Sequence, residues 1–383
     1  MRMIASCAED AWHSLHQPGA YEWWYFDALS EDREYGLVAI WFCGIPFSPD
    51  YNAHFEAYER GRALPPKPSD YAAFSFALYH CGQPIAYALV EYDTFTASTT
   101  QPMVCTGRNL LAYDPATATY HLNVDVDLTE VTTPIPVAIG RRLTGTFSFR
   151  NLNENWLSPA LMASGRGLMD QALGTHTWNL VAPVCATHGA LEITGADGRC
   201  ERRVTFVGRG YHDHNYDTVP MLRAINRWHW GRCWRGDRML IYYRNEPLPG
   251  QPGAFSFGAV FDGERPELVT DAIEIAFEAQ RRNWLGLKYP HRLSVTLPTT
   301  GETWTIHQQH IVDSGPFYVR FLSGSDVDKK THGVSETLDG RRLRWRLFRP
   351  MINTRIQRPP SRANLLPAPV ARLGRTALIW LVS

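Results

Sequence analysis

Residues 211–216 read Tyr-His-Asp-His-Asn-Tyr and bring together an acid, two imidazoles, two phenols and an amide. They follow a strand-like run at residues 203–207. In an extended strand, successive side chains point to opposite faces. The two faces then carry Tyr211, Asp213 and Asn215 on one side and His212, His214 and Tyr216 on the other. One face therefore joins a possible acid to two neutral hydrogen-bonding partners.

Asp213 has the strongest claim to chemistry. A carboxyl group buried among aromatic rings is disfavoured in its charged form, so its pKa rises and it keeps a proton near neutral pH. Such an acid can protonate an alkene if nearby π faces stabilise the carbocation. The candidate rings are Tyr211, Trp228, Trp230, Trp23 and Trp24. The structural alternative is that Asp213 caps a turn or pairs with Arg227 or Arg232.

His212 and His214 stand two positions apart, which suits two metal ligands on one strand face. A third ligand would have to come from His229 or from the pair His307 and His310. The distance of these residues from His212 and His214 in the sequence matches no known metal-binding motif. The sequence therefore predicts no metal site and favours imidazoles that hydrogen-bond the neighbouring loop. Serine-nucleophile, dinucleotide and phosphate-loop motifs are absent as well.

A second aromatic segment, Tyr-Glu-Trp-Trp-Tyr-Phe-Asp at residues 21–27, is followed by an apolar run at residues 35–43. The polar linker between them predicts a β-hairpin with a longer loop. Glu22 lies on the same face as Trp24 and Phe26. It is either a salt-bridged structural acid or a polar group in a pocket, and the structural reading is favoured.

Short strand-like runs separated by turn residues continue along the chain, without the strand–helix alternation of a parallel sheet. Before residue 217 they fall at 72–80, 85–95, 109–112, 119–126, 143–150, 175–180 and 189–194. After it they fall at 227–232, 238–243, 254–261, 268–278, 292–295, 304–309, 318–322 and 341–348. Residues 44–70 predict a long loop or cap, and residues 158–173 a short helix or lid. The pattern predicts an all-β protein of barrels or sandwiches.

The domain prediction is two β-domains, at residues 10–217 and 218–349, followed by an Arg- and Pro-rich tail at 350–383. The junction holds both residues 208–217 and the Trp228–Trp230 pair, and ligand cavities tend to lie at domain junctions. The tail either docks on the body or rests, as a basic segment with an apolar tip, on an anionic membrane.

Bulk composition narrows the possible partners. The 383 residues hold 38 Lys plus Arg and 38 Asp plus Glu, so the formal net charge is zero, which argues against a nucleic-acid partner held by phosphate contacts. Seven scattered cysteines predict reduced thiols. No secretory signal and no apolar run near the roughly 20 residues of a membrane span are present. We expect a cytoplasmic protein, with peripheral contact to the inner face of the membrane as the added alternative.

Two segments carry a family resemblance: Glu-Trp-Trp-Tyr-Phe at residues 22–26 and Gly-Tyr-His-Asp-His-Asn at residues 210–215. With Trp178, Pro183 and Gly189 between them, they resemble the carotenoid 1,2-hydratase (hydroxyneurosporene synthase) family over residues 15–348. The resemblance implies two tandem lipocalin-like antiparallel β-domains and no cofactor. It also implies addition of water across the terminal carbon–carbon double bond of an acyclic carotenoid, giving a tertiary alcohol.

Carried over by position, the resemblance makes Asp213 the general acid that protonates the alkene, with Tyr211 and Trp230 bordering the cation. The predicted catalytic group is Asp213, Tyr211, Trp230, His212 and His214. The predicted substrate-binding group is Glu22, Trp23, Trp24, Tyr25, Asn215 and Trp228. Two departures stand out. Residues 215–217 read Asn-Tyr-Asp where the family pattern has Asn-Trp-Gly, which leaves the substrate more open than the fold. The tail is also longer than the two domains need.

Two other functions fit the same residues. A cofactor-free cyclase or pericyclase of a terpenoid or polyketide polyene needs shape and a few hydrogen bonds more than a strong acid. A non-catalytic carrier of apolar ligands needs only the cavity. Replacing Asp213 by asparagine separates them, since only the hydratase depends on the proton.

Overall fold

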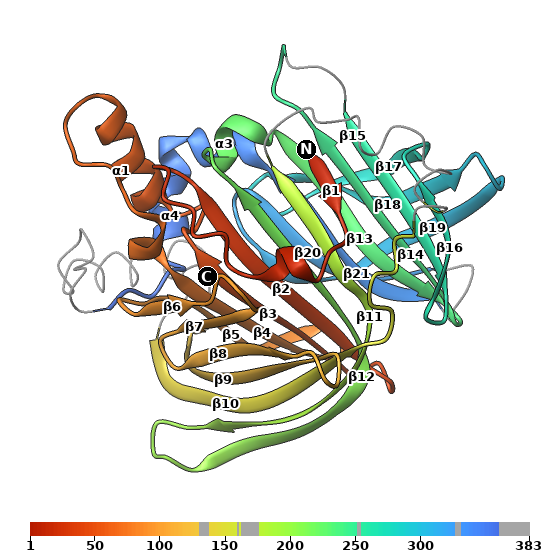
Figure 1. Cartoon of the computed structure of the whole chain (residues 1–383), viewed down its shortest axis with the longest axis horizontal. Helices are drawn as coiled ribbons and strands as arrows, with labels where there is room; N and C mark the ends of the chain where they lie inside the picture. The colour runs from red at the N-terminus through yellow and green to blue at the C-terminus, as the bar shows by residue number, and fades with distance from the viewer. Residues whose placement is uncertain (130–137, 159–160, 162–175, 251–253, 326–330, 360–383) are drawn as a thin grey trace.

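The computed structural model describes residues 1–129, 138–158, 161, 176–250, 254–325 and 331–359. Among these residues, nearly all regular structure is antiparallel β-strand in two curled sheets that lie side by side (Figure 1). The strands of sheet A end at Asp217 and those of sheet B begin at Arg227. The expected helix or lid at 158–173 lies almost wholly outside the described residues.

Sheet A has the strand order β5-β4-β3-β2-β12-β11-β10-β9-β8-β7-β6, with β1 (Arg2–Ile4) added in parallel to β11. Its strands are β2 (Tyr21–Ser30), β3 (Tyr35–Cys43), β4 (Ala73–His80), β5 (Gln83–Glu91), β6 (Phe95–Ala97), β7 (Met103–Thr106), β8 (Asn109–Asp114), β9 (Thr119–Thr129), β10 (Ala138–Asn151), β11 (Thr177–Thr194) and β12 (Cys200–Asp217). The central position of β12, between β2 and β11, buries most of its length.

Sheet B has the order β16-β15-β14-β13-β21-β20-β19-β18-β17. Its strands are β13 (Arg227–Arg235), β14 (Arg238–Glu246), β15 (Phe255–Asp262), β16 (Arg265–Thr270), β17 (Glu274–Arg282), β18 (Lys288–Leu297), β19 (Glu302–Ser314), β20 (Tyr318–Gly324) and β21 (Thr331–Asp339). The central strands β13 and β21 pair with each other.

Strands near the seam between the sheets are apolar on both faces because each face meets a different core. Trp24, Phe26 and Ala28 of β2 pack inside the curl of sheet A. Tyr25 of the same strand belongs to a second cluster, which it shares with Trp230 of sheet B. Two-sided burial therefore explains why the aromatic residues at 21–27 do not alternate with polar ones.

Three element predictions are wrong. Residues 44–70 contain the helix α1 (Pro49–Glu59), which begins after Ser48, whose side chain accepts a hydrogen bond from the Tyr51 amide. The expected strand at 268–278 is two strands, β16 and β17, at opposite edges of sheet B. The expected strand at 341–348 is a pair of 3-10 helices, η3 (Gly340–Arg344) and η4 (Arg346–Phe348), while β21 before them was not predicted.

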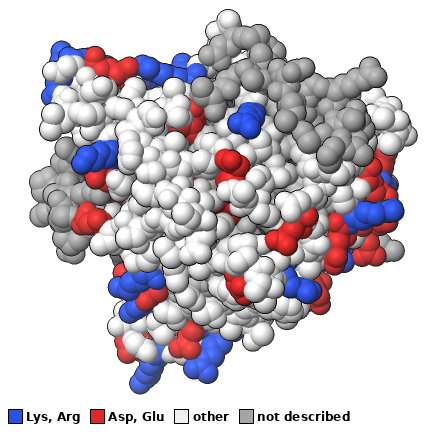
Figure 2. Space-filling view, in the orientation of Figure 1, with Lys and Arg blue, Asp and Glu red and all other residues white. Residues whose placement is uncertain are grey.

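The helices α1, α3 (Met221–Ala224) and α4 (Arg349–Asn353) gather at one end of the molecule (Figure 1). The start of the tail docks on sheet A, where Gln357 forms a parallel bridge with Val90. In the described part of the chain, no helix is long and apolar enough to cross a bilayer. On the face shown in Figure 2, positive and negative side chains lie interspersed, without a field of one sign.

Candidate active site

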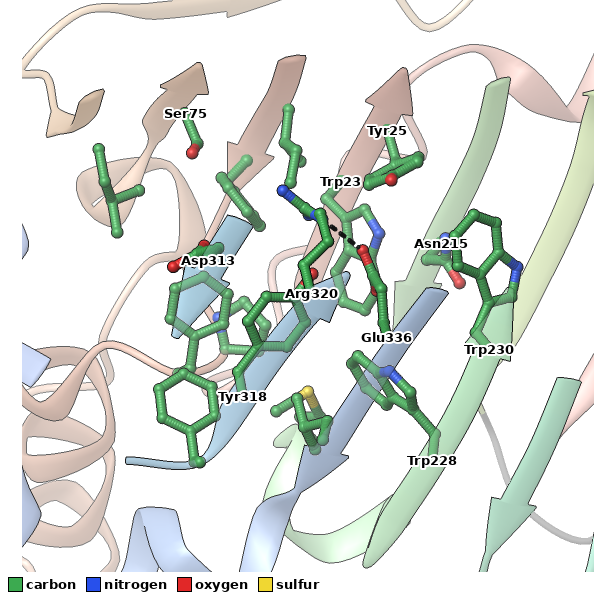
Figure 3. Close-up of a pocket in the computed structure, with 18 of the residues that line it drawn as sticks. Trp23, Tyr25, Ser75, Asn215, Trp228, Trp230, Asp313, Tyr318, Arg320 and Glu336 are labelled. Atoms are coloured by element: carbon green, nitrogen blue, oxygen red, sulfur yellow. Dashed lines mark hydrogen bonds and ion pairs between the residues drawn. The ribbon is translucent and has the colours of Figure 1, made fainter. Parts of the chain in front are cut away.

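A cavity lies between the two sheets, and strand register sets its walls (Figure 3). Cross-strand neighbours on β12, β2, β3 and β4 supply one wall: Asp213, Tyr25, Ile40 and Ser75. Neighbours on β14, β13, β21, β20 and β19 supply the other: Tyr243, Trp230, Glu336, Arg320 and Asp313. Side chains directly opposite each other on paired strands share a face, so each wall is a row that points one way.

Asp213 faces this cavity with its two oxygens differently bonded. The Tyr211 hydroxyl donates to Oδ2 at 2.6 Å, and Trp178 Nε1 donates to the same oxygen at 2.9 Å. Asn215 Nδ2 donates to Oδ1 at 2.7 Å. A carboxyl oxygen has two lone-pair positions, so Oδ1 keeps one that these donors do not use.

Burial raises the pKa of Asp213 to about 7, although the hydrogen bonds from Tyr211 and Trp178 act in the opposite direction. Among the described residues, no lysine, arginine or histidine forms an ion pair with this carboxyl group. It therefore keeps a large fraction of its proton near neutral pH, in contact with apolar space.

The arginines considered as partners of Asp213 are bonded elsewhere. Arg232 Nε donates to Asp27 Oδ1 at 2.8 Å within a fully buried pair. Arg227 lies 3.4 Å from Asp339. The structural alternative, in which a guanidinium neutralises Asp213, is thereby removed.

Aromatic rings surround the acid on both walls. The ring centroids of Tyr211 and Trp230 lie 5.2 Å apart, and those of Tyr25 and Trp230 lie 5.7 Å apart in an edge-on arrangement. Trp178 contacts Tyr243 of sheet B at 5.1 Å. Their negative π faces suit a developing positive charge.

The other face of β12 is closed off from the cavity. His212 bonds the Tyr25 carbonyl through Nδ1 at 3.0 Å and lies 3.1 Å from Asp10 through Nε2. His214 lies 2.9 Å from Glu22 through Nε2 and 3.3 Å from Asp10 through Nδ1. All four of these titratable side chains are buried, so we call them the rear network.

In the rear network, the hydrogen bonds and charges of the partners outweigh the effect of burial on the pKa of His214, Asp10 and Glu22. Burial acts to lower the pKa of His214, but hydrogen bonds to Asp10 and Glu22 outweigh it and raise the pKa to about 9. Burial likewise acts to raise the pKa of both acids, yet the imidazoles hold each below its ordinary value. The rear network therefore pairs the charged His214 with two carboxylates and fixes the backbone of β12.

The rear network also bears on metal binding. His13, Glu22 and His214 bring three potential ligand atoms within 4.8 Å of one another. Hydrogen bonds to Glu22 of 2.8 Å from His13 and 2.9 Å from His214 already use these atoms. A metal needs a deprotonated imidazole, whereas the raised pKa of His214 favours its protonated form. His229, considered as a further ligand, instead bonds Thr337.

The structure sorts the predicted site residues into two groups. Those that line the cavity are Asp213, Asn215, Trp23, Tyr25, Trp228 and Trp230, and Tyr211 bonds the acid. Those on the other face of their strands are His212, His214, Glu22 and Trp24. Strands β12 and β2 stand between the latter four side chains and the cavity, so these four do not line it, and their roles in catalysis or substrate binding stay predictions.

Charged residues on sheet B were not predicted. Glu336 accepts from Arg320 Nε at 2.9 Å inside the cavity (Figure 3). Asp313 pairs with Arg355, which also lines it. A single arginine inside the apolar run Tyr-Val-Arg-Phe-Leu at 318–322 is the signal that points to this wall.

Comparison with known proteins identifies the family. Residues 39–364 match the model of the carotenoid hydratase CrtC family. The hydroxyneurosporene dehydrogenase of Chlorobaculum tepidum is 32% identical over 372 residues, which cover 94% of this chain and 92% of that protein. The acyclic carotenoid 1,2-hydratase of Thiocapsa roseopersicina is 26% identical over 318 residues, covering 80% of this chain and 64% of that protein.

Solved structures share the fold at low sequence identity. The AttH protein of Nitrosomonas europaea superposes with a TM-score of 0.55 at 14% identity, covering 88% of this chain and 96% of that one. CghA, solved with Sch210972, superposes with a TM-score of 0.51 at 14% identity, covering 84% and 89%. The predicted all-β, lipocalin-like fold is confirmed. The predicted family resemblance is confirmed as well, and the chain is an enzyme of the hydro-lyase type that belongs to the carotenoid hydratase family.

Proposed function

We propose that this protein adds water across the terminal C1=C2 double bond of an acyclic carotenoid, with Asp213 as the acid. The observation that carries the proposal is a carboxyl group with a pKa of about 7 that lines an aromatic cavity and has no cationic partner among the described residues. Family membership and relatives named acyclic carotenoid 1,2-hydratase support the substrate class.

The proposed reaction begins when an apolar chain end enters the cavity and comes to lie beside Asp213 and Trp230. Asp213 transfers its proton to C2, which leaves a tertiary cation at C1 beside the rings of Trp230 and Tyr211. Water then adds to C1 and loses a proton. These steps move only protons and water, so they need neither an oxidant nor a reductant.

The test is incubation of purified protein with neurosporene or lycopene in heavy water. The proposal expects one deuterium at C2 and a hydroxyl group at C1. Asp213→Asn keeps the side-chain shape but carries no transferable proton, so we expect its rate to fall by about 10²–10⁴-fold. A folded Asp213→Asn variant that retains wild-type turnover would favour a shape-driven cyclase; saturable polyene binding without product would favour a carrier.

We also propose that the protein contacts the membrane in which its substrate dissolves. Three exposed apolar side chains, Trp284 (57%), Trp345 (53%) and Leu347 (75%), lie in two segments that Arg342 joins through hydrogen bonds to the Leu285 and Gly286 carbonyls. The exposed arginines around them are Arg281, Arg282, Arg344 and Arg346, and none has an ion pair within the described parts of the chain. Tryptophan with unpaired arginine suits the interface of an anionic bilayer.

Vesicle co-sedimentation tests this contact. We expect the protein to bind vesicles that contain phosphatidylglycerol and to lose about tenfold in partitioning when Trp284 and Trp345 are both replaced by serine. Val207→Ser, a change at an exposed apolar residue of β12, is the matched control and should bind as wild type does. Equal binding by all three proteins would rule out this surface.

A further inference from the structure

Glu336 is a second carboxyl group in the cavity, and its position follows from the pairing of three strands. On β21 it stands directly opposite Trp230 of β13 and opposite Arg320 of β20. All three side chains line the cavity, and Figure 3 shows Glu336 between Arg320 and the two tryptophans, Trp228 and Trp230. It therefore shares one enclosed space with Asp213.

Arg320 holds the Glu336 carboxyl group in place through an ion pair. Arg320 Nε donates to Glu336 Oε1 at 2.9 Å, and its Nη1 donates to the Tyr79 hydroxyl at 3.1 Å. Its guanidinium carbon also lies 5.6 Å from the ring centre of Tyr25 and 5.4 Å from that of Tyr318. The arginine is thus fixed on four sides, and the carboxylate that it binds is fixed with it.

A hydrocarbon chain end offers nothing for this ion pair to bind. Removing two charges from water costs more than their attraction repays in many buried pairs, so stability alone is a weak reason for the pair to be there. The other reactant of the hydration is a water molecule, which is small and polar and can bind to this ion pair. A carboxylate is an acceptor only, so it binds water through the protons that water must lose.

The two cavity carboxyl groups have opposite kinds of partner. Asp213 has neutral donors and no cation, whereas Glu336 has a guanidinium. Paired titratable groups whose surroundings drive their ionisation apart divide the roles of acid and base between them. Resting on the function proposed above, we propose that Glu336 binds the attacking water and accepts its proton as the C1–O bond forms.

The proposed steps balance. The O–H bond of Asp213 breaks as the π electrons of the alkene form the C2–H bond. Water forms the C1–O bond to the cation, and one of its O–H bonds breaks as Glu336 takes the proton. Asp213 is left as a carboxylate and Glu336 as an acid, and solvent water returns the proton to Asp213. The sum is alkene plus water giving tertiary alcohol.

The experiment separates protonation from water capture, using Glu336→Gln in heavy water. Glutamine keeps the shape and an oxygen that accepts from Arg320, but it is not a base. We expect alcohol formation to fall by at least tenfold, while deuterium appears at C2 of the recovered alkene, because an uncaptured cation returns a proton to solvent. Hydration by this variant at the wild-type rate would overturn the inference.

Two further proteins make the result specific. Glu302→Gln removes the same charge from an arginine pair of sheet B that does not line the cavity, so its ratio of alcohol to deuterated alkene should match wild type. Glu336→Asp keeps the charge and should retain more alcohol than Glu336→Gln. If Glu336→Gln loses deuterium exchange and hydration together, a structural role replaces the proposed one. If wild type introduces no deuterium anywhere, the acid step itself is wrong.

Discussion

Two buried acid sites flank β12, and they ionise in opposite ways. On the cavity side, Asp213 is 6% exposed and receives three hydrogen bonds from neutral donors. On the rear side, Asp10 and Glu22 are even more deeply buried, at 0% and 1% exposed, but lie against imidazoles. Burial acts to raise the pKa at both sites, yet only Asp213 ends above its ordinary value.

The difference shows that the charge of the partner, more than the depth of burial, sets the chemistry of each face. Neutral donors leave the desolvation penalty on the carboxylate partly uncompensated, so the proton stays on Asp213. The imidazolium of His214 lies against both rear acids and compensates it there, so these acids stay charged and serve as anchors. The predictions below test this contrast in order of decreasing expected effect.

The largest effect is expected where the rear network loses its shared carboxylate. Asp10→Asn leaves His212 and His214 without their common partner, and breaking a buried ion pair lowers the free energy of unfolding by about 3–5 kcal/mol. Urea titration at pH 6 measures it. Glu192→Gln, which removes a partner of Arg203 at the surface, should cost less than about 1 kcal/mol. Equal losses in both variants would contradict the electrostatic account.

A positive charge placed beside Asp213 should make this carboxyl group lose its proton near neutral pH, as Asp10 and Glu22 do. Asn215→Lys puts an ammonium group beside Asp213, which favours the charged form and lowers its pKa by about two units. The rate of hydration at pH 7 should fall by roughly 50-fold, in proportion to the protonated fraction of Asp213, and recover toward pH 5. Asn215→Met, without charge, is the control. An unchanged pH profile for the lysine variant would disprove the link between partner charge and activity.

Neutralising the cavity acid should stabilise the fold, but only at higher pH. The folded-state pKa of Asp213, about 7, lies above the ordinary value of 3.8 for an aspartate, so the wild type loses stability as pH rises between these values. Asp213→Asn should therefore gain on the order of 1–3 kcal/mol at pH 8 and nothing at pH 4. Calorimetry at both pH values gives the difference. A gain of the same size at both would show that ionisation is not its cause.

The smallest effect is expected when one neutral donor is removed. Tyr211→Phe keeps the ring beside Trp230 but deletes a hydrogen bond that lowers the pKa of Asp213. The alkaline limb of the rate profile should move upward by about one pH unit, with the rate at pH 6 changed only a few-fold. A downward shift would show that the hydroxyl group holds the proton-bearing form instead.

The alternation of side chains along an extended strand allowed much of the cavity-facing side of β12 to be predicted from the sequence. The face shared by Tyr211, Asp213 and Asn215 follows from a strand period of two, and the polar linker after residues 21–27 predicted the hairpin of β2 and β3. The sign of the pKa shift at Asp213 followed from burial among rings. All of these predictions rest on residues that are close together in the sequence.

The rest depended on strand register between distant segments. Asp10 meets His212 across 202 positions of sequence, and no local pattern announces that contact. Glu336 was missed with its strand, because Thr-His-Gly-Val-Ser-Glu-Thr-Leu-Asp is polar at most positions although β21 is central and buried. Polar residues buried between paired strands break the hydrophobic alternation on which sequence reading relies.

The seam between the sheets separates the two groups proposed to move protons. The proposed acid, Asp213, belongs to sheet A, whereas the proposed base, Glu336, and many other side chains that line the cavity belong to sheet B. If Asp213 and Glu336 act as proposed, changes elsewhere in the sheet B wall can alter which end groups fit without altering the acid. A chimera that joins residues 1–217 to the second half of a relative should change which end groups react, while the reaction keeps the pH dependence of the parent.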